Sequence, residues 1–245
     1  MTAQPGNRRF RPLWWATLLT LVVAALLSRL GMWQLHRAEE KQALLTQFES
    51  GQTTTEALSP DNIDRLPRYQ RVELRGHYDG EHQILLDNMP SQQGQAGYRV
   101  LTPLALEQGG WLLVDRGWLP LGATRSQLPD AKVGDGERAI VGLLDELPQP
   151  GVRLGDNPVA DPAAAWPRVL SFPRYEEVLH ALNRPLQRRI VLLDAAQPDG
   201  YERVWQAHFG FGPERHIGYA AQWFFLAVAV VVIYLMMSFK RDNSR

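Results

Sequence analysis

Two long apolar runs lie near the ends of the chain, and a more polar segment of domain size separates them. No charged residue occurs in residues 12–28 or in residues 217–239. As helices these runs would be about 25 Å and about 34 Å long, and the hydrocarbon core of a bilayer is about 30 Å thick. The apolar surface of the first run continues to Trp33, because the long side chain of Arg29 can reach the headgroups. The pattern predicts transmembrane helices at residues 12–33 and 217–239.

A cleaved signal peptide is the alternative interpretation of the first run. Such a peptide needs a shorter apolar region that is followed by a cleavage site of small residues. Here the run continues into Ser-Arg-Leu-Gly-Met-Trp-Gln at residues 28–34, which matches such a site poorly. We therefore expect the first helix to be retained as an anchor.

The two short tails set the expected orientation. Residues 1–11 carry three arginines, and residues 240–245 carry one lysine and two arginines. Both tails are therefore expected in the cytoplasm and residues 49–215 outside it. Three basic residues on the far flank of the first helix, Arg29, Arg37 and Lys41, favour the opposite orientation. The short N-terminal tail leaves little room for a transit peptide, so we expect a bacterial inner membrane with a periplasmic central domain.

The first helix is expected to continue beyond the membrane to about residue 48. Residues 31–48 are rich in strong helix formers and contain no proline. Trp33, Arg37 and Lys41 are spaced by four residues on one face of this extension. An indole at headgroup level is typical of an aromatic belt, so the simplest interpretation is a belt residue followed by solvated cations.

Alternating polarity predicts a half-buried strand at residues 69–78, and the turn signal at Asp79 and Gly80 predicts that residues 83–87 return beside it. A three-residue loop pairs Leu74 with Ile84 and keeps apolar residues opposite one another.

This register decides against a metal site built from His77 and His82. A two-residue loop would set the two imidazoles opposite each other, but it would also pair apolar residues with charged ones. The three-residue loop places the two histidines on opposite faces of the hairpin. We therefore do not expect a dihistidine metal site.

The remaining elements of the central segment complete a β-rich domain. Further strands are predicted at residues 98–106, 111–119, 139–147 and 189–193, with a turn at residues 107–110 and a helix at residues 173–182. The predicted fold class is a membrane-anchored α+β chain. In it, two transmembrane helices flank a mainly antiparallel sheet or small barrel that has one or two short helices.

Composition and motifs argue against several function classes. The charges balance at 26 basic and 26 acidic residues, so no nucleic-acid partner is expected. The absence of cysteine excludes disulfides, thiolate metal sites and thiol redox chemistry. His180, Glu176 and Glu177 are interpreted as packed or solvated residues of the predicted short helix. Since no nucleophile, phosphate-binding or zinc-protease motif occurs either, we do not expect an enzyme.

One group of residues at the start of the second span could carry chemistry. His216, Tyr219, Ala220 and Trp223 are spaced to lie on one stripe of a helix. The positive end of a helix dipole favours neutral imidazole, which is the form that ligates iron or copper. An indole and a phenol beside it could flank a planar macrocycle. The alternative is that Tyr219 and Trp223 are belt residues and that His216 is only a polar residue at the membrane boundary.

Four stretches then stand out in order along the chain. They are Leu-Gly-Met-Trp-Gln-Leu-His-Arg at residues 30–37, Gly-Tyr-Arg-Val-Leu-Thr-Pro-Leu at residues 97–104, Leu-Val-Asp-Arg-Gly-Trp-Leu-Pro at residues 113–120, and His-Ile-Gly-Tyr-Ala-Ala-Gln-Trp-Phe at residues 216–224. Together with the two-anchor layout, they resemble a bacterial member of the surfeit-locus (Surf/Shy) family of cytochrome c oxidase assembly factors.

The resemblance implies a non-enzymatic factor that aids the insertion of heme a into the large catalytic subunit of the oxidase. Implied partners are cytochrome c oxidase subunit I, heme A synthase and the lipid bilayer. Heme a would be bound transiently. The resemblance implies that His216 is the ligand of the heme iron. From their positions in the sequence, Tyr219, Trp223 and Trp33 are expected beside it, and Arg37 or Arg116 at a propionate. A scaffold that binds only protein and stabilises an assembly intermediate is the alternative.

Six further motif residues have two open interpretations, as structural positions or as a docking patch for an oxidase subunit. They are Gly31, Gln34, Tyr98, Arg116, Gly117 and Trp118. In the structural interpretation, Gly31 allows the anchors to approach closely, and Tyr98 and Trp118 are core aromatics of adjacent strands. Gly117 would then ease a bulge, and Arg116 would lie at the end of a strand.

Overall fold

The computed structural model describes residues 8–10, 12–122, 124–125, 127–150, 165–207 and 211–241. The chain divides into two compact units. The helical unit comprises residues 1–45 and 208–245, and the β unit comprises residues 46–207.

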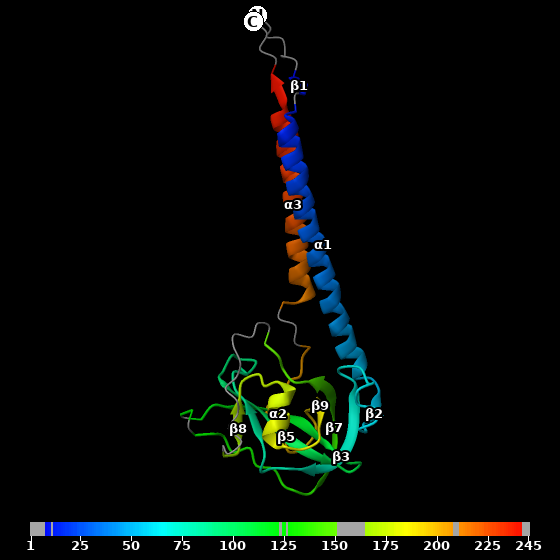
Figure 1. Cartoon of the computed structure of the whole chain (residues 1–245), viewed down its shortest axis with the longest axis vertical. Helices are drawn as coiled ribbons and strands as arrows, with labels where there is room; N and C mark the ends of the chain where they lie inside the picture. Colours follow the sequence, from blue (N-terminus) through cyan, green and yellow to red (C-terminus); the bar gives the residue numbers. More distant parts are fainter. Residues whose placement is uncertain are drawn as a thin grey trace, which may run out of the picture. The chain divides into compact units, whose positions relative to one another are not determined.

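The helical unit is an antiparallel pair of long helices, α1 (Trp14–Gly51, which runs on into the β unit) and α3 (Pro213–Ser238). Contacts between residues far apart in sequence fix the pairing: the Thr17 and Tyr234 hydroxyl groups are 2.5 Å apart, and the Gly31 backbone lies against the ring of Phe224. Beyond these helices, β1 (Arg8–Phe10) pairs antiparallel with β10 (Phe239–Arg241) (Figure 1).

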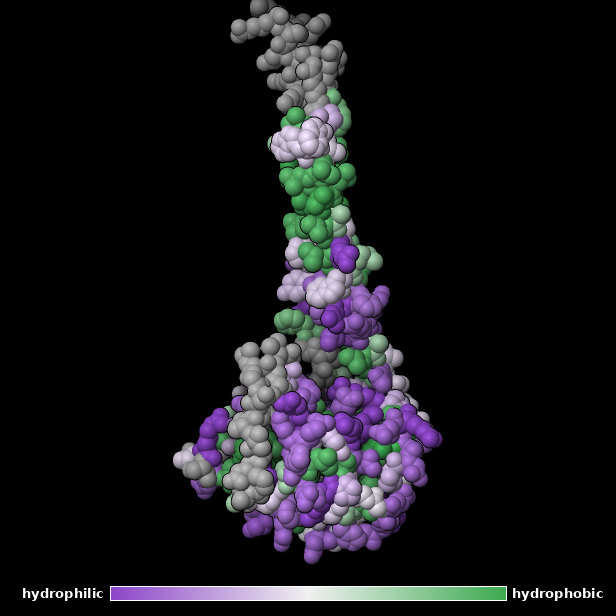
Figure 2. All heavy atoms as spheres, viewed as in Figure 1, coloured by the Kyte–Doolittle hydropathy of each residue, from purple (hydrophilic) through white to green (hydrophobic). Residues whose placement is uncertain are grey.

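Both helices are long and apolar enough to cross a membrane, and most of their apolar side chains are exposed. Figure 2 shows these hydrophobic residues as a band over the two helices. This composition fits a membrane protein, because the core helices of soluble proteins are mostly buried. The first helix continues without a break past residue 48, as the helix-forming composition there predicts. The second begins at Pro213, four residues before the apolar run, because proline is favoured in the first helical turn.

The β unit contains an eight-stranded sheet in the order β2-β3-β7-β9-β6-β5-β4-β8. Because β3 also pairs with β5, the strands β3, β7, β9, β6 and β5 close into a five-stranded barrel. The fold class expected from the sequence, a β-rich domain between two apolar helices, is therefore confirmed. The elements are β2 (Thr55–Ala57), β3 (Arg71–Tyr78), β4 (Ile84–Leu86), β5 (Gly97–Leu106), β6 (Trp111–Pro120), β7 (Glu137–Glu146), β8 (Arg168–Leu170), α2 (Tyr175–Leu182) and β9 (Leu186–Leu193).

Several barrel strands are buried on both faces. On β9, Val191 and Leu193 belong to a cluster inside the barrel, whereas Ile190 and Leu192 belong to a second cluster on the outside. The helix α2 contributes Val178 and Leu182 to the outer cluster and so covers that face of the sheet (Figure 1). Double-sided burial explains why alternation is weak in these strands.

Most predicted elements are present, but the hairpin of residues 69–78 and 83–87 is wrong. β3 and β4 do not pair with each other; both pair with the same edge of β5, through residues 76–78 and residues 84–86 respectively. The ten residues of β5 give an edge long enough for both, and the amide of Asp79 continues this ladder by donating to the carbonyl of Pro103 at 2.8 Å. The turn signal at Asp79 thus marks a corner between two strands, not a hairpin.

Candidate functional site

A polar contact near the start of α3 joins His216 to Gln34 of α1. Nδ1 of His216 lies 2.7 Å from Oε1 of Gln34. A carboxamide oxygen only accepts hydrogen bonds, so this contact requires a proton on Nδ1 of His216, and a neutral ring in this tautomer has its lone pair on Nε2. Histidines that ligate metals are held in the same way, with one ring nitrogen donating to an oxygen and the other directed at the metal.

Small residues bring the helices close enough for this contact. Gly31 and Ala38 on α1 are buried, as are Ala220 and Ala227 on α3, and each pair is spaced by seven residues. Spacing by seven keeps small residues on one seam of an antiparallel helix pair, which allows the backbones to approach.

Gly31 is the tightest point of this seam. A Cβ atom at Gly31 would lie 2.7 Å from the ring of Phe224, closer than van der Waals contact allows. Gln34 lies one turn beyond Gly31, on the same face of α1, and it therefore faces the first turns of α3, where His216 lies.

The aromatic residues predicted around His216 occupy different surfaces. Trp223 is half-buried in the seam, as His216 is, but Tyr219 is 43% exposed and Trp33 is 51% exposed. The stripe predicted to face the neighbouring helix therefore includes His216, Ala220 and Trp223, with Tyr219 turned outward.

Arg37 and Trp33 form a second, exposed pair on α1. The Arg37 guanidinium lies over the Trp33 ring at 5.6 Å from its centroid and donates from Nη1 to Glu40 at 2.7 Å. That hydrogen bond and the nearby positive charges hold the pKa of Glu40 below its ordinary value, so Glu40 stays ionised. The structure thus supports two local pairs, Gln34 with His216 and Trp33 with Arg37.

Arg116 is not available to a propionate or to a docking partner. It is 1% exposed and lies within β6 instead of at a strand end. Its three guanidinium nitrogens donate to the carbonyl of Asp199 at 2.6 Å, the carbonyl of Ala131 at 2.9 Å and the hydroxyl of Tyr201 at 3.4 Å. A buried cation whose donors are all engaged is part of the core, so both functional interpretations of Arg116 are corrected.

Residues 194–205 form a strap across the β unit before the second membrane helix. Gly117 and Trp118 of β6 contact this strap. Gly117 has φ +106°, and it forms the bulge at which residues 116 and 117 face a single residue of β5. The amide of Trp118 donates to the carbonyl of Glu202 at 2.8 Å. A Cβ atom at Gly117 would lie 2.7 Å from that carbonyl oxygen and 2.6 Å from the side chain of Arg203.

The aromatic residues of the same motifs are also internal. Tyr98 and Trp118 are buried, and the Trp118 indole donates to the carbonyl of Met89 at 2.8 Å. Asp115 is fully buried, where its carboxylate pairs with Arg99 and accepts from the amide of Gly117 at 3.0 Å. Burial raises the pKa of Asp115 despite the nearby guanidinium. The side chains of Tyr98, Asp115 and Trp118 therefore lie inside the β unit.

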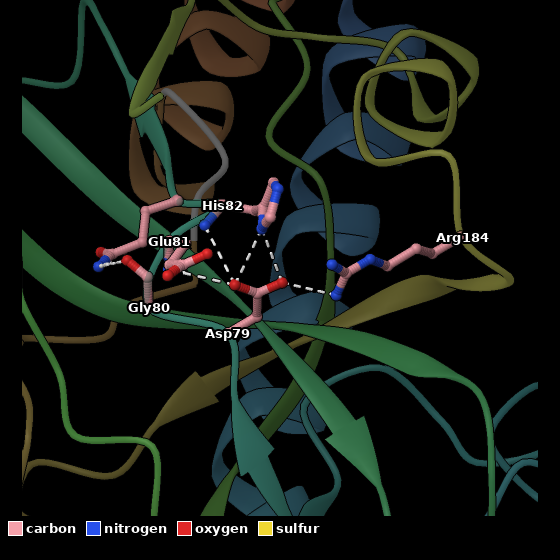
Figure 3. Close-up of polar contacts among 6 residues, drawn as sticks. Asp79, Gly80, Glu81, His82 and Arg184 are labelled. Carbon is pink, nitrogen blue, oxygen red and sulfur yellow. Dashed lines mark hydrogen bonds and ion pairs between the residues drawn. The ribbon is translucent and has the colours of Figure 1, made fainter. Parts of the chain in front are cut away.

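A further cluster, absent from the sequence-based prediction, holds the corner between β3 and β4. The Asp79 carboxylate accepts from Nδ1 of His82 at 2.9 Å and pairs with Arg184 at 2.6 Å (Figure 3). It also accepts from the amides of Glu81 and His82. Among the residues that the structure describes, no group of three or more histidine or acidic side chains could hold a metal ion, and His77 is exposed.

Comparison with known proteins places the chain beside one family along nearly all of its length. The model of the SURF1 family matches residues 21–228. Similar proteins include SURF1-like proteins of Rickettsia felis, 24% identical over 89% of this chain and 95% of the relative, and Rickettsia bellii, 24% identical over 93% and 91%. A SURF1-like protein of Monosiga brevicollis is 24% identical over 97% of this chain and 92% of the relative. The family resemblance inferred from the four motifs is confirmed.

Proposed function

The chain belongs to the SURF1 family, a family of oxidase assembly factors, and we propose that it aids the insertion of heme a into subunit I of a heme-copper cytochrome c oxidase. The family is not a catalytic one, and we propose a binding role without catalysis for this chain as well. The observation that carries the heme proposal is the hydrogen bond between Gln34 and His216.

The helical unit offers one imidazole nitrogen that fits the heme iron. Gln34 keeps the proton of His216 on Nδ1, so Nε2 is the nitrogen with a free lone pair. Iron porphyrins take an axial imidazole ligand of this kind. A single ligand on a half-buried ring suits a carrier, because a cargo held by two strong ligands would be released slowly.

Other residues of the helical unit would orient the cargo. Trp223, half-buried in the seam, and Tyr219, exposed beside it, would cover an apolar ring on the side of α3. Trp33 would contribute a further aromatic surface on α1. The guanidinium of Arg37 is exposed and can exchange Glu40 for a propionate by a charge-assisted hydrogen bond, whereas Arg116 cannot.

A heme-independent scaffold is the second candidate. The hydrogen bond between Gln34 and His216 is also consistent with this function, because such a bond between two membrane helices stabilises their register even when no heme is bound. In that case the β unit would stabilise an oxidase assembly intermediate by binding protein alone. Subunit I and heme A synthase are the proposed partners of the first function, and subunit I is the partner of the second.

We place the chain in a bacterial inner membrane, with both tails cytoplasmic and the β unit periplasmic. The support is the pair of apolar helices and the basic residues of the tails. Alkaline phosphatase fused after residue 245 should be inactive, and the same enzyme inserted in the turn at residues 107–110 should be active. The reverse result would invert the orientation.

The heme proposal is tested by the absorption spectrum of the purified full chain from cells that make heme a. The wild type should show a heme spectrum, and His216→Ala should reduce bound heme at least tenfold by loss of the axial ligand. His36→Ala is the matched control, because His36 is an exposed histidine of α1 whose ionic partners among the described residues are Glu39 and Glu40. An unchanged spectrum in His216→Ala would remove His216 from the role of ligand, whereas wild-type protein without heme would leave the scaffold as the function.

A further inference from the structure

One polar side chain projects from the apolar surface of α3. Gln222 lies five residues after Ile217, where the apolar run begins, which places it about 8 Å along the helix from that end. Its side chain is exposed, and among the residues that the structure describes it has no hydrogen-bond partner. A carboxamide carries both donors and an acceptor, and lipid tails satisfy neither. Gln222 therefore needs a partner from outside the chain.

Gln222 faces away from α1. It follows the buried Ala220 by two residues, which is a rotation of about 200° around the helix. Arg29 is exposed on the outer face of α1, two residues before Gly31, and Gly31 lies against Phe224. Arg29 and Gln222 are therefore at similar depths on opposite sides of the helix pair. The long side chain of Arg29 can reach the headgroups, whereas the shorter Gln222 needs a partner at its own depth.

Four further exposed residues of α3 continue the line of Gln222 along the helix. Their spacing alternates between three and four residues, which keeps them on one seam at about 3.5 residues per turn. They are Phe225, which is 74% exposed, Ala229, Val232 and Met236, which is 71% exposed. Such a seam packs against a second helix, and a single polar residue in it fixes the register. Exposed apolar residues alone would suit lipid, so the inference depends on the carboxamide.

We propose that two copies of the chain associate through this seam, with their Gln222 carboxamides hydrogen-bonded to each other. A twofold axis along the membrane normal makes the two α3 helices parallel and brings Gln222 to the same depth in both. The carboxamide is self-complementary, because the N–H of one donates to the oxygen of the other. Twofold association through the outer face of α1 would instead set two Arg29 charges against each other. The proposal is independent of the heme role, since Gln34 and His216 lie outside this seam.

Disulfide cross-linking of the full chain in membranes tests the seam. The chain contains no cysteine, so each single-cysteine variant reports on one position. Phe225→Cys should form a disulfide-linked dimer on mild oxidation, because the seam brings the two copies of this position together. Leu26→Cys is the matched control and should not form the dimer. Leu26 is 57% exposed within the apolar part of α1, on the face that bears Arg29.

The dissociation constant of the dimer, measured by analytical ultracentrifugation in detergent, tests the carboxamide. Gln222→Leu should weaken the dimer about five- to 30-fold, as expected for the loss of hydrogen bonds between membrane helices. Gln222→Asn retains a carboxamide and should retain most of the affinity. Ala229→Phe overfills the seam and should also weaken the dimer, whereas Ala25→Phe, an equal change at an exposed position of α1, should leave it unchanged.

Four results would overturn the proposal. Equal cross-linking of Phe225→Cys and Leu26→Cys would exclude this seam, and an unchanged dissociation constant in Gln222→Leu would show that the carboxamides do not meet. Weaker association in Arg29→Gln would assign Gln222 to a head-to-tail contact with Arg29 of the next copy. Loss of a co-purifying oxidase subunit from Gln222→Leu, with no cross-linked dimer in Phe225→Cys, would assign the seam to a partner helix.

Discussion

The side-chain oxygen of Gln34 lies 2.7 Å from Nδ1 of His216, and this contact connects residues 182 positions apart in the chain. One residue follows the first apolar run, and the other precedes the second. Their contact gives Gln34 a defined chemical effect, since it sets which imidazole nitrogen carries the proton. Gln34 is therefore a positioning residue for His216 in the proposed heme role.

Replacing Gln34 should weaken heme binding without removing the ligand. Gln34→Leu deletes the acceptor, so the ring of His216 is free to rotate and to exchange its proton between nitrogens. We expect heme affinity to fall by about 10- to 100-fold, the range found for lost partners of metal-bound histidines. Gln34→Glu retains an acceptor oxygen and should retain most of the affinity. Heme titration followed by absorbance measures both, and wild-type affinity in Gln34→Leu would reduce this contact to helix packing.

A larger residue at Gly31 should separate the two membrane helices. Gly31→Leu places side-chain atoms where the Phe224 ring lies, and overpacking of this kind costs about 1–3 kcal/mol. Gly218→Leu is the control, because a Cβ atom at Gly218 meets nothing within 4 Å. Equilibrium unfolding of the full chain in mixed detergent micelles compares them. Equal stabilities would show that the helices are not packed through Gly31.

Substitution of Gly117 should displace the strap at residues 194–205. Gly117→Ala adds a Cβ atom beside Arg203 and the Glu202 carbonyl, at a backbone angle that alanine rarely adopts. Gly109→Ala carries the same kind of backbone strain, with φ +91°, but nothing lies within 4 Å of its Cβ position.

The difference between these two alanine variants isolates the cost of moving the strap. We expect Gly117→Ala to be less stable than Gly109→Ala by about 1–3 kcal/mol, and its strap to be cut faster by a protease under native conditions. Thermal unfolding and the rate of limited proteolysis supply the two measurements. Identical behaviour would mean that the strap does not depend on its contact with Gly117.

The sequence predicts the local parts of this fold better than its long-range parts. The antiparallel pairing of β5 with β6 depends on a short local turn, and the sequence predicts that turn at residues 107–110. The pairing of β3 and β4 was wrong because the choice between a hairpin and a corner depends on β5, which follows later in the chain. A local turn signal carries no information about that competing edge.

The candidate site could also be predicted only in part from the sequence, but for different physical reasons. His216, Gln34 and Arg116 were all singled out by motif, but their roles depend on neighbours. A helix that is apolar on nearly all sides has no polar face, so its sequence does not indicate which side faces the neighbouring helix. The contact of Gln34 with His216 could therefore not be predicted. Arg116 was expected at the end of a strand or in a docking patch, whereas carbonyl groups from two distant segments allow its burial.

The last prediction concerns pH, through the Asp79 cluster. Burial alone would raise the pKa of Asp79, but the hydrogen bond from His82 and the positive charges of His82 and Arg184 outweigh it and lower the pKa below its ordinary value. A carboxyl group with a lowered pKa stabilises the folded state above its unfolded pKa, and that stabilisation is lost as the pH falls through the folded pKa.

Asp79→Asn should therefore destabilise the β unit at pH 6 by about 1.5–3 kcal/mol, the range for hydrogen bonds to charged groups, and the deficit relative to wild type should shrink below about pH 4. Asp130→Asn is the control, because Asp130 is an exposed carboxylate whose ionic partner is the exposed Lys132. Thermal unfolding of both variants and of the wild type between pH 6 and pH 2.5 gives the comparison. A deficit of equal size at both ends of this range would show that Asp79 acts through its shape and not through its charge, since protonation removes only the charge.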